Sequence, residues 1–574
     1  MASTKMPAPN AEPPPRPRPP PTRGDRVHEA VFVFVLCLAQ FLSLAAMNQT
    51  VAPLLILSEY FDIHDYGNLS WFSAAYSMTV GTFILPAGRL GDIHGHKRIF
   101  MLGWAWFSLW SLIAGFCGRS QLVLFSTFRA FQGIGPALVI PNAIALIGRT
   151  FPIGLKRNLA FACFGAAGPT GAAVGAVLAA LVAETISWHW CFWLLAITCA
   201  CLVVVSKFVI PDQDENVDGS PDGEQPEFDW PGAITGVAGL VLVNFALNQA
   251  PIVGWSNPYI PCLLAAGLLF LGTFVWVELR VATQPIIPIR GLQRNAAFTL
   301  ACVFAGWSSH GIWVYYLYLF LEHLRGHSAL LTSAETFPVA ITGLFFAFLT
   351  VWLLRRVAVS WVMFFAMFFF LLGSLLIAIM PLEQSYWANT FVAVLLMPGA
   401  MNLSFPAATI LLSTALPKEK QGIAASLVAT VVNYSISCGL GLAGSIHKNS
   451  LVHAANVEGL DGPPPPLSVS NPQLIAVRLA GLRAAYWFAV GLGGLGMLIA
   501  GLFILVQRSE RPGKGGAQEE RESDSADNGS SAQDWTGSMP TPLMSHELGD
   551  KTSITTFYLG DKVIRVAETP SQGV

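Results

Sequence analysis

Apolar residues along this chain occur in long, nearly unbroken runs, and short polar stretches separate one run from the next. An α-helix needs about twenty consecutive apolar residues to cross the roughly 30 Å of hydrocarbon in a bilayer. Fourteen runs reach that length, which predicts an all-α polytopic membrane protein with about fourteen transmembrane helices. They lie near residues 30–57, 70–90, 98–117, 122–148, 158–183, 189–210, 230–249, 258–279, 296–321, 333–354, 359–380, 387–413, 421–446 and 484–506.

The polar stretches divide the chain into parts. Both ends are polar, the first rich in proline and the last in Ser, Gly, Glu and Asp, so we expect them to be disordered tails. The first apolar run is too long for a signal peptide and lacks a small-residue cleavage site, so it should stay in the mature protein. The expected parts are a tail at 1–28, a six-helix bundle at 29–210, an acidic cytoplasmic linker at 211–229, two inserted helices at 230–280, a second six-helix bundle at 281–506 and a cytoplasmic tail at 507–574.

A weak internal repeat relates the two predicted bundles. GPALVIPNAIALI in the fourth run matches PGAMNLSFPAATILL in the twelfth, so that Pro141 and Pro406 align at an offset of 265 residues. The starts of the fifth and thirteenth runs, KRNLAFA and KQGIAAS, match at nearly the same offset. Because repeated halves are typical of secondary transporters, the repeat favours a transporter over a receptor or a membrane enzyme.

The Lys and Arg residues of the loops alternate in density along the chain. Positively charged short loops stay on the cytoplasmic side of a membrane, so the pattern predicts that both termini are cytoplasmic. The cytoplasmic loops would then carry Arg89, Lys97, Arg98, Arg149, Lys156, Arg157, Arg280, Arg290, Arg294, Arg355, Arg356, Lys418 and Lys420, and the external loops only Arg119, Arg325, Lys448, Arg478 and Arg483.

Composition excludes several classes of function. Hydrophobic residues make up 53% of the chain and charged residues only 11%, against about 25% charged residues in soluble domains, so a water-soluble globule is excluded. The net charge of -2 gives no basic surface for nucleic acid. The nine cysteines lie in apolar runs without metal-ligand spacing, and no GxxxxGK[ST] occurs. We therefore expect no metal site, no cofactor, no use of ATP and no enzymatic activity.

The most specific local pattern is GRLGDIHGHKRIF at 88–100, between the second and third runs. Asp92 follows the carboxyl end of a predicted helix, where the helix dipole disfavours a negative charge unless cations lie nearby. Arg89, Lys97 and Arg98 can supply those cations. The glycines, which allow a tight turn and a close helix approach, are Gly88, Gly91 and Gly95. The alternative is a solvated loop whose charges only set the topology.

Two further runs carry residues that a lipid-facing helix avoids. Arg129 lies roughly 12 Å into the run 122–148, at 1.5 Å per residue, where an arginine is unfavourable unless it faces a cavity or a partner. Gln132 lies one turn further on the same face. Arg129 therefore either lines a translocation path or pairs with backbone carbonyls or a polar neighbour. Gly168 and Pro169, roughly 17 Å into the next run, predict a bent helix that packs closely on another.

These patterns resemble the major facilitator superfamily. The loop at 88–100 is similar to the signature loop of that family, FRAFQGIGPA at 128–137 to its fourth-span motif, and GAAGPTGAAVGA at 165–176 to its exporter motif. WHWCF at 188–192 and the inserted pair of helices resemble the fourteen-span drug:proton antiporters, and GIWVYYLYLF at 311–320 resembles the fungal aminotriazole-resistance branch. The sequence departs from these motifs at Ile93, His96, Ala172, Ala173 and His189.

The resemblance implies a major-facilitator fold of two six-helix repeats plus two inserted helices. It implies a gating loop that latches the outward-open state, formed by Gly88, Gly91, Asp92, Gly95, Lys97 and Arg98. It further implies an exporter-type helix kink at Gly168 and Pro169. Arg129 would line the path and tune a proton or substrate site.

The sequence departs from the antiporters at the position expected to couple transport to protons. Fourteen-span antiporters usually carry Asp-x-Thr in the first span, whereas this chain has Asn48 there, and an amide cannot carry a proton. His310 in the ninth run is the alternative proton carrier, because imidazole titrates near about pH 6.5. A bland alternative is a histidine hydrogen-bonded to a serine or a carbonyl. Trp307 and Tyr318 share its helical face and either line the central cavity or pack against lipid and neighbouring helices.

The expected function is secondary active export of a small organic compound by proton antiport across a lipid bilayer. An uncoupled facilitator, motivated by Asn48, and a membrane sensor that signals through residues 507–574 are the alternatives. We expect a monomer in the plasma membrane, with the vacuolar membrane as the second choice. Asn68 begins Asn-Leu-Ser in the first external loop and is the most accessible glycosylation sequon. Acids near the ends of runs, where solvation is expected, are Asp92, Glu184, Glu322 and Glu335.

Overall fold

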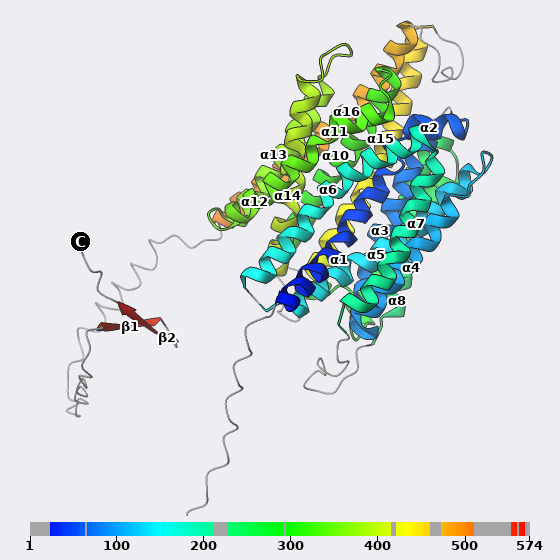
Figure 1. The fold of residues 1–574 in the computed structure, drawn as a ribbon. Coiled ribbons are helices and arrows are strands. Elements are labelled where there is room, and N and C mark those ends of the chain that lie inside the picture. The colour runs from blue at the N-terminus through cyan, green and yellow to red at the C-terminus, as the bar shows by residue number, and fades with distance from the viewer. Residues whose placement is uncertain are drawn as a thin grey trace, which may run out of the picture. The chain divides into compact units, whose positions relative to one another are not determined.

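A helix coincides with each of the fourteen predicted runs in the computed structural model (Figure 1). The structure describes residues 23–63, 66–152, 154–211, 227–291, 294–414, 421–459, 472–509, 553–559 and 562–568. Within these ranges, twelve helical segments are long and apolar enough to cross a membrane. The two other predicted spans coincide with α3 (Tyr66–His94) and α4 (His96–Ala114), which contain many Ser, Gly and Trp residues and charged ends. The all-α membrane fold is confirmed, and the count of fourteen spans stays a prediction.

The helices form two groups joined by an inserted pair. The first group contains α1 (Arg23–Asn48), α2 (Leu54–Tyr60), α3, α4, α5 (Leu122–Thr150), α6 (Leu155–Thr185) and α7 (Trp188–Val209). The inserted pair is α8 (Trp230–Val253) and α9 (Tyr259–Arg280). The second group contains the 3-10 turn η1 (Ile289–Gly291), α10 (Arg294–Leu319), the π-helical turn η2 (Phe320–Leu324), α11 (Ala329–Thr336), α12 (Pro338–Leu354), α13 (Val359–Ala378), α14 (Asn389–Ser413), α15 (Gln421–Val457) and α16 (Pro472–Ser509).

Two helix pairs carry the main contact between the groups, which we call the N-bundle and the C-bundle. Helix α3 packs against α15, and α6 packs against α12. The inserted helices α8 and α9 pack on each other, and α8 also touches α3 and α15. One apolar core runs through both bundles. The two bundles therefore meet along helices that a rocking motion would have to slide or separate.

Prolines explain where the helices depart from the predicted runs. The first run was expected to extend to residue 57, but α1 ends at Asn48 and the short helix α2 begins after Pro53. Pro338 likewise begins α12 and separates it from α11. A proline lacks the N–H that an uninterrupted helix requires, so a helix restarts at or after it.

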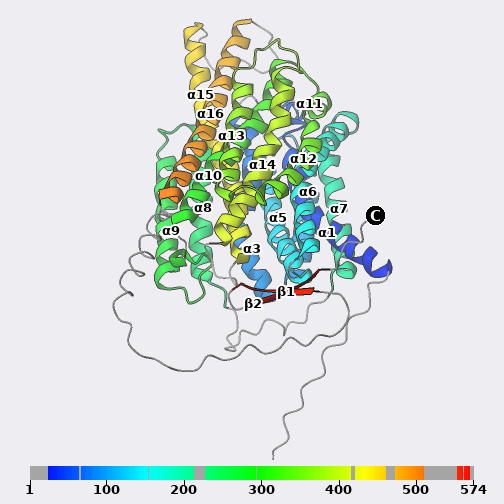
Figure 2. The ribbon, with the colours of Figure 1, turned by 90° about the vertical axis from the view of Figure 1, so that its left-hand side faces the viewer.

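Helices α15 and α16 are longer than predicted, with 37 and 38 residues. At 1.5 Å per residue each is about 55 Å long, well beyond the roughly 30 Å of a bilayer core. Figure 2 shows the pair extending past the other helices. A separate apolar cluster of Leu451, Ala455 and Val477 packs the extended parts together.

The segment 507–574 was predicted to be disordered throughout, and this prediction missed a β-hairpin. Strand β1 (Ser553–Leu559) pairs antiparallel with β2 (Lys562–Glu568). Both strands are rich in β-branched residues, and only two residues, Gly-Asp, separate them, which is a hairpin signal. The polar composition of the whole tail concealed this short pattern. Residues 510–574 form a unit of their own.

Candidate functional site

Arg129 lies at the middle of the N-bundle and is fully buried. Its Nε donates to the carbonyl of Phe72, 3.0 Å away, and its Nη2 to the carbonyl of Ala46, also at 3.0 Å. Its Nη1 donates to Gln132 Oε1, and the guanidinium lies 4.5 Å from the centre of the Tyr76 ring. These contacts are the ones expected if Arg129 pairs with backbone carbonyls and a polar neighbour. In this structure Arg129 ties α1, α3 and α5 together, and its role in a translocation path stays a prediction.

The Arg129 site extends through uncharged polar groups. Gln132 Nε2 donates to Ser111 Oγ at 2.7 Å, which connects α5 to α4. The hydroxyl of Tyr76 donates to the carbonyl of Ser43 at 2.8 Å, which connects α3 to α1. The polar centre of the N-bundle is therefore a set of hydrogen bonds and one cation–π contact around a buried cation. Such a network holds its helices in one arrangement as long as every member is satisfied.

The candidate residues of the C-bundle lie along α10. Trp307, His310 and Tyr318 are 6%, 7% and 4% exposed, so they are packed rather than lipid-facing. Trp307 Nε1 donates to Ser404 Oγ at 3.1 Å, and the Tyr318 hydroxyl lies 2.7 Å from Thr336 Oγ1. The His310 ring lies between the rings of Trp307 and Trp313, at 5.4 and 6.1 Å, and its Nδ1 has no hydrogen-bond partner among the residues that the structure describes. The imidazole is thus enclosed by aromatic rings, and a role of this stripe as a cavity wall stays a prediction.

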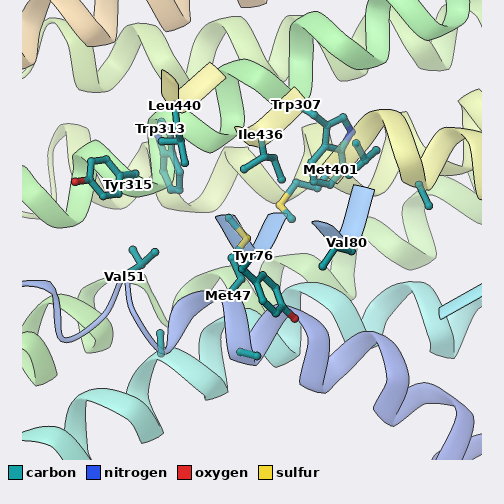
Figure 3. Close-up of a cluster of buried hydrophobic side chains, with 14 of the residues drawn as sticks. Met47, Val51, Tyr76, Val80, Trp307, Trp313, Tyr315, Met401, Ile436 and Leu440 are labelled. Atoms are coloured by element: carbon teal, nitrogen blue, oxygen red, sulfur yellow. The ribbon is translucent and has the colours of Figure 1, made fainter. Parts of the chain in front are cut away.

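An apolar layer separates the two polar centres (Figure 3). Met47 and Tyr76 of the N-bundle face Trp307, Met401 and Ile436 of the C-bundle across this layer, and all five are buried. In the described part of the chain no hydrogen bond or ion pair joins Arg129 to His310. The structure therefore places them in different bundles, on opposite sides of a closed centre.

Asn48, which stands where an antiporter acid was expected, holds the end of α1. Its Nδ2 donates to the carbonyls of Leu44 and Ala172, each at 3.3 Å. Ala172 belongs to α6, one turn beyond the predicted kink at Gly168 and Pro169. On the other side of that kink lies Gly343 of α12, where an added Cβ would lie 2.8 Å from Pro169 Cβ. The kink therefore forms part of the contact between the bundles.

The predicted gating loop brings α3, α4 and α5 together. An added Cβ on Gly91 would lie 1.8 Å from Asn142 Oδ1, so only glycine permits this approach of α3 to α5. Gly95 adopts a left-handed φ of 89° between α3 and α4, a conformation that glycine adopts without strain. Gly88 lies near Ser426 and Pro141, without a comparably close contact.

The cations of the loop are placed differently from the prediction. The Asp92 carboxylate lies 3.5 Å from Arg149 Nη2 at the end of α5 and 3.5 Å from His96 Nε2. Arg149 was not predicted as a partner, and His96, a departure from the family pattern, also lies 2.7 Å from Asn142 Oδ1. Lys97 donates to the carbonyl of Lys207 at 3.0 Å. At least one cation near Asp92 is therefore supplied by α5 and not by the loop itself.

Arg89 and Arg98 are the remaining cations of the predicted gating loop. Arg89 donates to Gln284 and to the carbonyl of Glu227, which tethers α3 to the segments flanking the inserted pair. Arg98 is exposed near the start of α4. Gating by this loop stays a prediction.

Asn68 lies in the first turn of α3 and not in a loop. The asparagine is half-buried, and Ser70, the third residue of the sequon, is 3% exposed and donates to the carbonyl of Gly67. Helix α3 therefore begins four residues before the predicted run, which starts at residue 70, and includes the sequon. Glycosylation at this position stays a prediction.

A cavity of about 630 Å³ lies between α1 and α6. It extends from an exposed ion pair, Lys156 Nζ to Glu29 Oε2 at 2.9 Å, to Phe41 and Ala167, next to the kink. Most of its other lining residues are apolar, with Cys37 and Cys163 among them. Clefts that bind small molecules have about 300–1,000 Å³ and a mostly apolar lining with a few polar groups, which this cavity matches.

Two acids that the sequence reasoning assigned to solvated span ends have structural roles. Glu322, in η2, is 1% exposed, and its Oε2 accepts from the backbone N–H of Leu55 in α2 at 2.9 Å. Glu184, at the end of α6, accepts from the N–H of Leu330 in α11 at 2.7 Å. Each carboxylate therefore crosses from one bundle to the other. No periodicity in the sequence signals this, because it depends on how the bundles meet.

Two helical bundles with buried polar centres and apolar outer faces define a polytopic membrane transporter. The chain belongs to the major facilitator superfamily, since the model of the family described as Major Facilitator Superfamily matches residues 36–442. The family and the relatives below are transporters and not enzymes.

Relatives from fungi refine this assignment. The chain is 46% identical over 476 residues to a low affinity ammonium transporter of Saccharomyces cerevisiae, covering 83% of this chain and 88% of the relative. It is 40% identical to efflux pump terJ of Aspergillus terreus, covering 83% and 88%, and 33% identical to the aminotriazole resistance protein of Saccharomyces cerevisiae, covering 83% and 84%. The predicted resemblance to the drug-efflux and aminotriazole-resistance branch is thereby confirmed.

The solved structures support the fold alone. A POT family transporter in complex with a peptide superposes with a TM-score of 0.55 at 16% identity, covering 84% of this chain and 96% of that one. This likeness agrees with a major-facilitator fold and adds nothing about substrate.

Proposed function

We propose that this protein exports a small organic compound across a membrane in exchange for protons. The observation that carries the export proposal is the cavity between α1 and α6. It leads from Glu29 and Lys156, at the predicted cytoplasmic end, to Ala167 beside the exporter-type kink at Gly168 and Pro169. A compound entering there would reach the α6–α12 contact, which has to move when the bundles rock. The names of two relatives, an efflux pump and an aminotriazole resistance protein, support the same direction.

A second candidate is movement of ammonium, because the relative with 46% identity is named a low affinity ammonium transporter. The described cavity offers a carboxylate, Glu29, for a cation, but its remaining walls are mostly apolar and suit an organic compound better. Asn48 cannot carry a proton, so for either substrate, the organic compound or ammonium, it favours facilitated transport without proton coupling as an alternative. A sensor that signals through residues 507–574 is the alternative without net transport. Deletion of that segment should abolish the phenotype if the protein is a sensor and should spare it if the protein is a transporter.

The experiment reconstitutes the full-length protein in liposomes and follows two probes, 3-amino-1,2,4-triazole and ammonium, under an imposed pH gradient. Proton antiport predicts that triazole accumulates on the acidic side against its own gradient. Triazole movement that ignores the pH gradient would contradict antiport. Movement of ammonium alone would transfer the proposal to the second candidate. If the carrier is an uncoupled facilitator, the Asn48→Asp variant should acquire pH dependence.

The cavity provides an internal reporter for the same experiment. Cys163 lines it and is exposed, whereas Cys201 and Cys262 are exposed outside it. A bound probe should slow the reaction of Cys163 with a maleimide and leave Cys201 and Cys262 unaffected. Equal reaction rates with and without saturating probe would contradict the cavity as the entry route.

The membrane and orientation belong to the same proposal. We infer a plasma-membrane protein with both termini in the cytoplasm, with the vacuolar membrane as the alternative. The support is the distribution of Lys and Arg in the loops. We also propose that the monomer is the functional unit, because each expected site lies within one chain.

A further inference from the structure

Glu322 is a buried carboxyl group that the proposed function does not yet use. It lies in the π-helical turn η2 at the end of α10, and its side chain is 1% exposed. Its Oε2 accepts from Leu55 N–H at 2.9 Å, and within the described ranges its Oε1 has no hydrogen-bond partner. Single π-helical turns in α-helices are frequent at functional sites. An ionised carboxyl group is unfavourable in this setting, because burial removes its hydration and one of its oxygens has no hydrogen bond that replaces the lost water.

The position of Glu322 connects the two bundles. Leu55 is the second residue of α2, so its N–H has no acceptor within that helix. Helix α2 belongs to the N-bundle but packs against α10, α11 and η2 of the C-bundle. By the predicted orientation this is the external end of the protein. When the bundles separate there, Glu322 and Leu55 must part, and the carboxyl group becomes accessible to water.

Few charged groups face Glu322. The carboxylate of Glu184 acts on it from α6, and the Tyr318 hydroxyl lies near it on α10. His323 of η2 is beside Arg478 of α16, and α2 contributes the Leu55 N–H. In the described part of the chain no Lys or Arg nitrogen lies within 4.0 Å of the Glu322 carboxyl group. A bound proton is therefore the available way to neutralise it when the end closes.

We propose that Glu322 is a proton-binding gate at the external end, a regulation that rests on the proposed transport. In the open state the hydrated Glu322 carboxylate takes up a proton from the outer solution. The proton resides on Oε1, and Oε2 keeps accepting from Leu55 N–H, so the neutral group can be buried as α2 closes against η2. An ionised Glu322 holds this end open. When the end opens again the proton returns to the outer solution, so Glu322 sets the pH at which this end closes and moves no proton across the membrane itself.

Glu184 provides a matched control. It makes the same kind of bond, from a carboxylate to a backbone N–H of the other bundle, at 2.7 Å, but it is exposed. Glu184→Gln removes a charge and retains an acceptor for Leu330 N–H. Glu322→Gln does the same for Leu55 N–H, yet cannot exchange a proton. The two variants share the geometry of the bond and differ in the burial of the carboxyl group. Glu184→Gln also removes a charge that acts on Glu322, so the presence of the infrared band is compared and not the pH at which it titrates.

The test is infrared difference spectroscopy of the purified full-length protein, titrated across about pH 4 to 9, the range in which perturbed carboxyl groups titrate. The wild type should show the carbonyl stretch of a buried protonated carboxyl group. The component of the band that comes from Glu322 should disappear in Glu322→Gln and persist in Glu184→Gln, and a component from Glu278, which is 5% exposed, should remain in both variants. A band unchanged in Glu322→Gln would overturn the proposal. If Glu322→Gln does not elute as a folded protein, Glu322→Asp should shift the band, and an identical band would overturn the proposal.

Transport of 3-amino-1,2,4-triazole in liposomes separates this inference from the function on which it rests. At a fixed pH difference, the transport rate of the wild type and of Glu184→Gln should depend on the pH of the solution that faces the external end, and Glu322→Gln should lose that dependence. A dependence retained in Glu322→Gln would overturn Glu322 as the gate and leave antiport standing. A wild type indifferent to the gradient, with the infrared band still assigned to Glu322, would overturn antiport and support the proton site alone.

Discussion

Replacement of Arg129 tests whether this buried cation holds the N-bundle together. Arg129→Ala would remove three buried hydrogen bonds, to the carbonyls of Phe72 and Ala46 and to the amide oxygen of Gln132. An unpaired buried group costs about 1–3 kcal/mol in soluble proteins, whereas interhelical hydrogen bonds in membranes average about 0.6 kcal/mol. Loss of the cation–π contact with Tyr76 adds about 1–2 kcal/mol. We expect a total loss of about 2–5 kcal/mol.

The conservative variant makes the prediction sharper. Arg129→Lys keeps the charge, but a single ammonium nitrogen cannot reach acceptors on three sides as the guanidinium fork does. We expect Arg129→Lys to lose about 1–3 kcal/mol, because one or two of the three buried hydrogen bonds would be missing. The assay heats detergent-solubilised protein and measures the fraction that still elutes as a monodisperse peak. The melting temperature should fall in the order wild type, Arg129→Lys, Arg129→Ala.

The exposed Arg119, which donates to the carbonyl of Glu59 at 3.4 Å, is the control, and Arg119→Ala should melt like the wild type. A wild-type melting temperature in Arg129→Lys would refute the structural role. If its transport were nevertheless lost, Arg129 would act on the substrate or proton path, as the sequence analysis predicted. If Arg129→Lys were less stable but each folded molecule transported normally, the hypothesis that Arg129 lines the translocation path would be refuted.

Three further substitutions follow from close contacts. Gly91→Ala should displace Asn142 and destabilise the α3–α5 contact by about 1–3 kcal/mol, seen as a lower melting temperature. Gly343→Ala should press on Pro169 and slow transport of 3-amino-1,2,4-triazole more than it lowers the melting temperature, because the contact lies between the bundles. Burial, with a nearby carboxylate second, raises the pKa of Tyr386 to about 12. Below that pH its hydroxyl keeps its proton and donates to the carbonyl of Glu335. Tyr386→Phe should therefore lower the stability by about 1 kcal/mol, by the same amount between about pH 6 and 9.

Matched glycines test the first two of these. An added Cβ would meet nothing within 4 Å at Gly165 or Gly272. Gly165→Ala and Gly272→Ala should therefore leave the melting temperature unchanged or slightly higher, because alanine favours the helix. Equal losses in all four alanine variants would contradict the steric explanation. A cost of Tyr386→Phe that grows between about pH 6 and 9 would contradict a protonated hydroxyl there.

The apolar pattern predicted the helices well because a helix in hydrocarbon has to satisfy its own backbone and cover itself with apolar side chains. The same logic predicted that Arg129 has partners within the protein. It did not predict the burial of Glu322, because that depends on a π-helical turn and on how α2 meets the other bundle. Asp92 shows the same limit: its distance to Arg149 follows from the packing of α3 on α5 and not from the spacing of charges within its own loop.

The extended ends of α15 and α16 have a practical consequence. Because Leu451, Ala455 and Val477 pack the two helices together there, the pair presents a stable helical epitope beyond the bilayer. In the predicted orientation this epitope is extracellular. An antibody fragment that recognises it would stain intact cells if the protein is in the plasma membrane, and only permeabilised cells if it is vacuolar. The same fragment would add a rigid, recognisable mass to a transporter that otherwise has little structure outside the membrane in its described part.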